Sequence, residues 1–397
     1  MRTDDLDATG SLPATAVTPE PAPFGTLAPC PSPLRHPFRA AGWLLSLGAG
    51  LVSLLVILAI LAALPPLNVV ALGVMLEAEG RVVRSGRLRD GIPFAGALPR
   101  LGTIVVGTWA WLLLVRLVSQ AAADAALVDP GGPTARFWAA ARPLAAALVG
   151  VHLLAALHDG GSAASFLRPL RSLRRLVAVV RAGTAWERAA LALSRVLDTI
   201  RPGHLAWLGA RGFAGAFLWL FLPTVLFSAF RDTTRPGALL VTLVGAAGLV
   251  LALSWVPFLQ ARFAADGTFA AFGEVARVRS MWRRAPLAML AACLVLYGLS
   301  LPLPLFKVVA APRDVVLFLT PIFVVTIYPA RLAVGWATHR AEARQGPRSI
   351  LLRLPVNVVV VVALLAYLFL LFFTPAIDAF GRRTLFDHHA LLLPTPF

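Results

Sequence analysis

The chain has 397 residues, of which 58% are hydrophobic and 14% are charged, whereas soluble globular domains average about 45–50% and about 25%. A soluble fold cannot hide that much apolar surface, so the composition excludes an ordinary soluble domain. The formal charge of +17 would suit a nucleic-acid-binding protein. However, the arginines lie in alternate connections between apolar blocks, which is typical of a membrane protein with a positive inner side. We therefore expect no nucleic-acid partner.

Residues 1–34 are predicted to form a disordered, proline-rich tail. They contain seven prolines, carry three aspartates near the start and show no hydrophobic periodicity. The acidic start and the distance to the first apolar block do not fit a secretory signal peptide. Residues 35–397 are predicted to form one transmembrane helical domain.

Apolar blocks follow one another through the rest of the chain, and each approaches the length of about 20 residues that crosses a hydrocarbon core about 30 Å thick. They do not alternate with period two, so a helical bundle is favoured over a barrel. The predicted spans are 41–64, 66–84, 101–121, 136–157, 206–230, 238–260, 286–306, 315–337 and 355–376. The fold class is thus all-α, a polytopic bundle with amphipathic helices on its inner face. We expect about nine spans, or eight if 66–84 is re-entrant, because Glu77, Glu79 and Arg81 lie in that block.

The distribution of charge predicts the orientation in the membrane. With nine spans and a cytoplasmic N-terminus, 26 of the 36 basic residues lie on the inner side and 7 on the outer side. This asymmetry is typical of cytoplasmic loops. We therefore expect a multi-pass protein of the inner, or plasma, membrane of a bacterial cell.

The long connection 159–205 is predicted to be a cytoplasmic, amphipathic helical insertion. Apolar residues recur in it at helical spacing, and arginines lie on or beside the other face. The apolar positions are Phe166, Leu170, Leu173, Leu176, Val177 and Val180, and the basic ones are Arg168, Arg171, Arg174, Arg175 and Arg181. Such a helix lies in the membrane interface with its apolar side down. The alternative is a helix that simply covers the inner face of the bundle.

A second helix is expected after Gly183, opened by a capping box of Thr184 and Glu187. A further basic, amphipathic connection runs from 261 to 285 and ends in Arg283 and Arg284. These two arginines and the five of the insertion are the candidate contacts for anionic lipid or a partner protein.

Ionisable residues inside spans are functional hypotheses by default. Arg116 and Arg331 lie near span ends, where a snorkelling side chain is the simpler interpretation. His152 is expected to be a core histidine, and Asn357 is expected to cap or link helices by hydrogen bonds. Glu77 is expected to pair with Arg81 one turn on.

The sequence contains no motif for a catalytic, cofactor or metal site. A phosphate-binding loop, an H-E-x-x-H zinc helix and a G-x-S-x-G elbow are all missing. His158-Asp159 and the cluster at 387–389 fall on opposite sides in the predicted topology, so we expect no shared metal site. Cys30 and Cys293 are expected to be free thiols.

Two segments resemble a family of prokaryotic polytopic membrane proteins known only as a domain of unknown function. The first is 67–73, Leu-Asn-Val-Val-Ala-Leu-Gly, followed by a charged helix. The second runs from Arg262 to Phe272 and leads through Arg283 and Arg284 into a span. The resemblance covers residues 40–110 and 255–305, and it implies a fold and a membrane location without an activity.

The first functional hypothesis is a non-enzymatic membrane protein whose basic cytoplasmic face binds anionic lipid or a partner protein. The alternative is a transporter or permease-like component for a small solute, suggested by the number of spans and by helices interrupted at prolines. A lipid-modifying enzyme would need convergent polar residues at one interface, and we find no such set.

Overall fold

The computed structural model describes residues 30–231, 236–305, 313–377, 385–386, 388 and 390–394. These residues form helices and turns, and none of them lies in a β-strand, which confirms the all-α prediction. The predicted tail 1–34 falls outside the described residues apart from 30–34.

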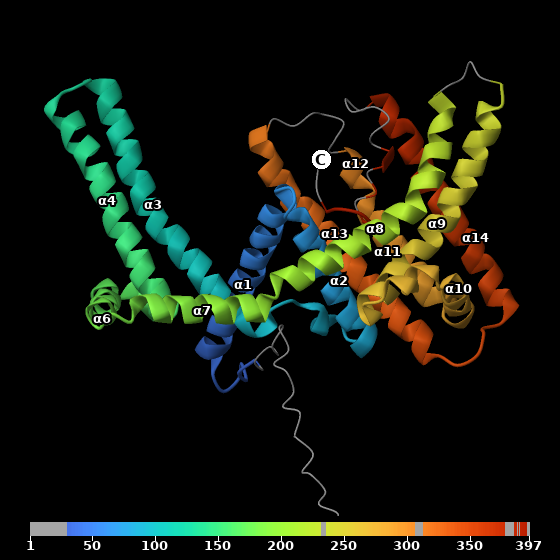
Figure 1. The fold of residues 1–397 in the computed structure, drawn as a ribbon, viewed down its shortest axis with the longest axis horizontal. Coiled ribbons are helices and arrows are strands. Elements are labelled where there is room, and N and C mark those ends of the chain that lie inside the picture. Colours follow the sequence, from blue (N-terminus) through green and yellow to red (C-terminus); the bar gives the residue numbers. More distant parts are fainter. Residues whose placement is uncertain are drawn as a thin grey trace, which may run out of the picture.

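Fourteen α-helices are found in the described part of the chain (Figure 1). They are α1 (Pro37–Ala63), α2 (Asn68–Ser85), α3 (Leu98–Val128), α4 (Pro133–His158), α5 (Ala163–Leu167), α6 (Pro169–Arg181), α7 (Ala185–Ile200), α8 (Pro202–Phe227), α9 (Ala238–Asp266), α10 (Val275–Arg284), α11 (Pro286–Ser300), α12 (Pro302–Leu305), α13 (Arg313–Ala343) and α14 (Ile350–Ile377). Short 3₁₀ turns join some of them, at Leu88–Gly91, Ala95–Ala97, Ser228–Arg231 and Phe269–Gly273.

Seven described helices are long and apolar enough to span a membrane, and an eighth is counted if the pair α10–α11, bent by 109°, is one span. The expected nine spans are not confirmed, and the difference is α2. This helix carries Glu77, Glu79, Arg81 and Arg84, so its composition is not that of a simple span. Its position is nevertheless internal, because 11 of its 18 residues are buried.

Close backbone approaches hold α2 in the middle of the bundle. A Cβ atom added at Gly73 would lie 1.9 Å from the carbonyl oxygen of Leu205 in α8, and one at Gly80 would lie 2.2 Å from that of Ala264 in α9. Small residues at helix crossings allow such approaches, and packing then replaces the hydrophobic driving force that lipid does not supply. Gly73, part of the segment that carries the family resemblance, is therefore a packing residue.

Helices α3 and α4 form a hairpin that extends away from the main bundle (Figure 1). The first turns of α3 pack on α1, where Gly102 and Gly50 bring the two backbones together. Farther along, apolar side chains of both helices are exposed, among them Trp109, Leu117 and Leu154. Helix α6 lies across the lower end of the hairpin, and α7 runs from there to α8 (Figure 1). The hairpin and the bundle are thus joined along one side by the predicted insertion.

Candidate functional site

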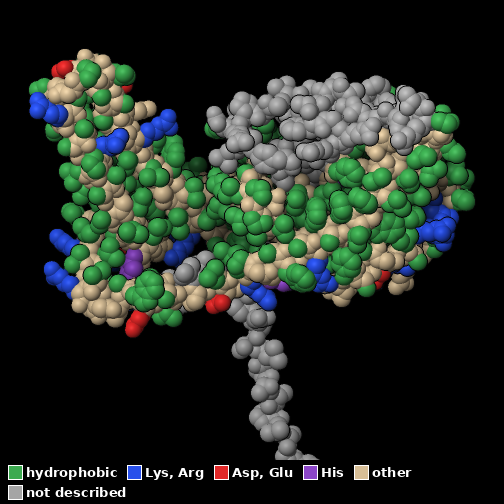
Figure 2. All heavy atoms as spheres, turned by 45° about the horizontal axis from the view of Figure 1, so that its top comes forward, with side chains coloured by type: hydrophobic (Ala, Val, Ile, Leu, Met, Phe, Trp, Pro, Cys, Tyr) green, Lys and Arg blue, Asp and Glu red, His purple; other side chains and the backbone are tan. Residues whose placement is uncertain are grey.

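The five candidate arginines of the insertion all belong to α6 or to the residue that precedes it. Pro169 occupies the first helical position, where its missing N–H is not needed. Ser172 and Val179 are buried on the side of α6 that packs against α4. Four of the five make no ion pair among the described residues, and all are exposed: Arg168, Arg171, Arg174 and Arg181. Figure 2 shows basic side chains at this end of the hairpin.

The part of the predicted apolar stripe that lies on α6 runs beside these arginines and is largely exposed, whereas Phe166, its first predicted member, lies in α5 and is buried. Leu170 is 70% exposed and Val180 is 58% exposed, and Leu173 and Val177 are exposed as well. The side chains of α7 are more exposed than those of α6, because none of the described ones is buried and Trp186 is 81% exposed. Amphipathic helices with their apolar sides uncovered are typical of segments that lie in a membrane interface.

Arg175 differs from the other four because it has a carboxylate partner. Its guanidinium donates to Asp159 at the end of α4, and the hydroxyls of Ser165 and Ser172 donate to the same carboxylate at 3.2 and 3.4 Å. The hydrogen bond from Arg175 holds the pKa of Asp159 below its ordinary value, against the opposing effect of burial. This cluster fixes α6 to the end of the hairpin.

One local prediction in this region is wrong. Thr184 precedes α7 as expected, but its side chain caps no backbone N–H, and its hydroxyl is buried without a partner. The cap that does form is at α5, where the hydroxyl of Ser162 accepts from the N–H of Ser165 at 3.3 Å. His152 is a core histidine as predicted. Its Nε2 lies 3.2 Å from the carbonyl oxygen of Phe166, and its ring packs on Trp111.

Arg283 and Arg284 lie at the end of α10, and α10 and α6 lie at opposite ends of the molecule's longest axis (Figure 1). They form no ion pair in the described part of the chain. Helix α10 itself is fixed by charge, since Arg262 of α9 pairs with Asp266, Glu274 and Glu342. Arg277 of α10 pairs with Glu342 at 3.2 Å. Asp266, Glu274 and Glu342 are therefore each ion-paired with Arg262, Arg277 or both.

The prediction that Arg331 snorkels is wrong. Its side chain is 3% exposed, and its Nη1 donates to Glu79 Oε2 of α2 at 3.1 Å and to Gln260 Oε1 of α9 at 3.2 Å. The Nε and Nη2 atoms are buried without a partner. Glu77, by contrast, pairs with Arg81 at 3.8 Å as predicted. Sequence reasoning missed the buried cluster because Glu79, Gln260 and Arg331 lie far apart in the chain.

The described residues near the C-terminus connect to this cluster. Gln260 Nε2 donates to the carbonyl oxygen of Leu391 at 3.0 Å and to that of Gly212 at 3.1 Å. His388, from the cluster at 387–389, is buried with its Nε2 3.4 Å from the hydroxyl of Thr224. Of the residues near the end of the chain, the described ones that Gln260 and Thr224 contact, Leu391 and His388, therefore pack inside the bundle.

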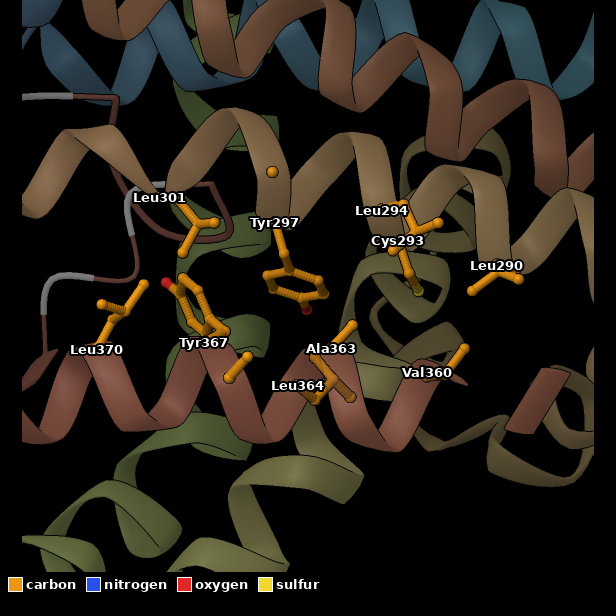
Figure 3. Close-up of a pocket in the computed structure, with 12 residues that line it drawn as sticks. Leu290, Cys293, Leu294, Tyr297, Leu301, Val360, Ala363, Leu364, Tyr367 and Leu370 are labelled. Atoms are coloured by element: carbon orange, nitrogen blue, oxygen red, sulfur yellow. The ribbon is translucent and has the colours of Figure 1, made fainter. Parts of the chain in front are cut away.

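An apolar cavity of about 240 Å³ lies between α11 and α14 (Figure 3). One wall runs from Leu290 on α11 to Leu301, the residue after this helix, and the other runs from Val360 to Leu370 on α14. The side chains of Cys293 and Tyr297 point into it from α11 (Figure 3). Cys293 is a free, buried thiol, and Cys30 is free and exposed, as predicted for both.

No family model matches the chain, and neither a curated protein nor a solved structure is significantly similar to it. The resemblance of segments 67–73 and 262–284 to a prokaryotic membrane family therefore stays a prediction.

Proposed function

We propose that this chain is a non-enzymatic, multi-pass protein of the cell inner membrane whose cytoplasmic face binds anionic phospholipid through α6 and α7. The observation that carries the proposal is the exposed apolar stripe of α6 beside four arginines that have no carboxylate partner. Apolar burial and attraction to anionic headgroups act together on a helix of this kind.

The size of the electrostatic contribution supports lipid as the ligand. Each basic residue near an anionic leaflet contributes about 1 kcal/mol, so the four unpaired arginines of α6 supply roughly 4 kcal/mol. Arg175 contributes less because Asp159 already neutralises it. Salt screens such exposed charges, so the attraction is expected to weaken as the ionic strength rises.

The proposed orientation has nine spans, with the N-terminus and α6 on the same, cytoplasmic side. Its support is the internal position of α2, which follows α1 after a short turn and is largely buried. With α2 crossing, 26 of the 36 basic residues lie on the cytoplasmic side.

The test uses the full chain extracted from membranes that contain both anionic and zwitterionic phospholipids. The ratio of the two lipids that co-purify is measured at low and high salt. We expect anionic lipid to be enriched at low salt, and the substitution of Arg168, Arg171, Arg174 and Arg181 by Gln to remove most of this enrichment. Arg136→Gln with Arg142→Gln, at exposed positions toward the other end of α4, is the matched control and should retain it.

Two results contradict the proposal. One is an unchanged lipid ratio in the variant with four substitutions, and the other is an equal loss in the control. If cross-linking from α6 captures a single protein while the lipid ratio does not respond to the arginines, α6 binds a partner protein and the lipid proposal is overturned.

A second candidate function is a permease-like component that moves a small solute. The buried Glu79–Arg331–Gln260 cluster favours it, because ionisable groups inside a bundle often line solute pathways. Gln260→Cys, in a chain with both native cysteines replaced by Ser, tests it. Labelling by a water-soluble thiol reagent supports a pathway, whereas a folded variant that resists labelling from both sides contradicts it.

A further inference from the structure

Positive charge is concentrated at the inner ends of α11 and α14. Residues 275–305 and 343–377 contain seven arginines and neither an aspartate nor a glutamate. The carboxylates that directly precede the two segments, Glu274 and Glu342, are paired with Arg262 and Arg277. The positive charge of Arg283 and Arg284 is therefore not balanced by any described carboxylate.

The fold brings α10 and the start of α14 together at this corner. The N–H of Arg348, just before α14, donates to the carbonyl oxygen of Arg283 at 2.8 Å. Arg353, in the first turn of α14, has a buried Nε with no hydrogen-bond partner. Asn357 follows one turn later on the same face; it is exposed, and no side-chain hydrogen bond joins it to another described residue. The buried Nε of Arg353 therefore lies without a described acceptor near the start of α14, the end that the Arg348–Arg283 hydrogen bond joins to α10.

The apolar cavity lies farther along α11 and α14, where its lining begins at Leu290 and Val360 (Figure 3). Arg353, Asn357, Val360 and Leu364 are spaced three and four residues apart, so they lie on one face of α14 that runs from the charged corner to the cavity. The buried floor is made by Cys293, Tyr297, Leu364 and Tyr367, and the exposed Leu294 and Leu370 form part of its rim. The cavity is thus a groove that opens toward the surroundings of two candidate spanning helices.

The dimensions of the groove match one acyl chain. From Leu290 to Leu301 the helix rises roughly 16 Å at 1.5 Å per residue, and half of a hydrocarbon core is about 15 Å thick. The volume of about 240 Å³ is below the roughly 300–1,000 Å³ of pockets that enclose a whole drug-sized molecule. Arg283 and Arg284 end α10 just before the bend into α11, and from Pro286 to Leu290 the rise along α11 is roughly 6 Å. Long arginine side chains at this end therefore reach the headgroup layer.

We propose that α10, α11 and α14 form a specific site for one anionic phospholipid. Its phosphate is held by Arg283, Arg284 and Arg353, and one of its acyl chains lies in the groove beside Cys293 and Tyr297. Charge complementarity selects an anionic headgroup, because bidentate contacts from guanidinium groups suit phosphate. The proposal rests on the proposed function in placing this end of α11 at the anionic cytoplasmic leaflet.

Filling the groove provides the test. A Cβ atom added at Gly298 meets no heavy atom within 4 Å, so Gly298→Leu occupies the groove without a backbone clash. Ala291→Leu, an exposed position of α11 that does not line the groove, is the matched control. The full-length variants are compared by native mass spectrometry after titration with phosphatidylglycerol and with phosphatidylcholine.

We expect the unaltered chain to retain one phosphatidylglycerol and to prefer it to phosphatidylcholine. Gly298→Leu should lower the affinity for that lipid by about tenfold or more, and Arg283→Gln with Arg284→Gln should abolish the preference for the anionic headgroup. A second readout uses the Cys30→Ser chain, in which Cys293 is the only thiol. Bound lipid should slow its alkylation by a membrane-permeant maleimide.

The outcomes separate this site from the α6–α7 surface. If Gly298→Leu and the Arg283/Arg284 variant bind lipid like the control while the α6 variant loses its enrichment, the groove proposal is overturned and the proposed function stands. If the α6 variant keeps its enrichment but these two variants lose the single lipid, the groove stands and the α6–α7 proposal fails. An alkylation rate of Cys293 that does not change when phosphatidylglycerol is added also contradicts the groove proposal.

Discussion

Removing one partner of the Glu79–Arg331 pair is expected to destabilise the bundle far more than removing both. The side chains are 2% and 3% exposed, and Nη1 of Arg331 lies 3.1 Å from Oε2 of Glu79. At an effective dielectric constant of 20, Coulomb's law gives an attraction of about 5 kcal/mol at this distance. Arg331→Met removes this attraction and leaves the Glu79 carboxylate buried without a counter-charge.

The expected loss for Arg331→Met is about 3–5 kcal/mol, the usual cost of orphaning one member of a buried pair. Arg331→Met combined with Glu79→Gln leaves no unpaired charge at this site, so its stability should be close to that of the unaltered chain. Double replacements of this kind are often neutral because the desolvation penalty of both ions disappears with their attraction.

The assay is heating of the purified full chain in detergent at one fixed rate, followed by tryptophan fluorescence. A fixed rate is needed because large proteins often unfold irreversibly. Arg340→Met is the control: Arg340 lies in the same helix but stacks on Trp336 at 4.7 Å, so its replacement should cost about 1 kcal/mol or less. The reasoning is refuted if Arg331→Met unfolds at the temperature of the unaltered chain, or if the double variant is no more stable than Arg331→Met.

Two other predictions concern packing and pH. Gly73→Val should prevent the recovery of monodisperse protein, because its Cβ would lie 1.9 Å from the carbonyl oxygen of Leu205. The control Gly48→Val should be tolerated, since no atom lies within 4 Å of its Cβ. Equal yields of the two variants on size-exclusion chromatography would disprove this. The lowered pKa of Asp159 means that its bond to Arg175 stabilises α6 fully at neutral pH, and that this stabilisation is lost as the pH falls below about 4. Hydrogen exchange in 169–181 should therefore accelerate in acid and in Asp159→Asn at neutral pH; acid-insensitive exchange would contradict the role of this pair.

Much of the fold could be predicted from the sequence because the hydrophobicity of consecutive residues shows whether a helix prefers lipid to water. A run of about 20 apolar residues needs no distant partner to identify it. The eight predicted spans other than 66–84 accordingly correspond to the seven candidate spanning helices and the bent α10–α11 pair. The amphipathic helix of the insertion was found for the same reason, since its apolar and basic positions repeat every three or four residues.

The sequence could not decide which polar residues become partners. Glu79 and Arg331 are 252 positions apart, and no local pattern shows that α2 packs between α8, α9 and α13. Arg331 lies near a span end, where snorkelling is the simplest interpretation. Only the tertiary fold shows that neighbouring helices bury its side chain away from water. The capping box at Thr184 failed similarly, because the orientation of one hydroxyl depends on how α6 meets α7.

The sequence by itself thus determined that the chain is helical, that much of it suits a lipid environment and where its arginines gather along the chain. Tertiary structure alone decided which arginines are neutralised, as with Arg175 by Asp159, and which side chains line an apolar groove, as with Cys293 and Tyr297. The physical reason is range. Solvent preference is a property of each segment, whereas ion pairing and cavity shape arise only when distant segments come within a few ångströms of each other.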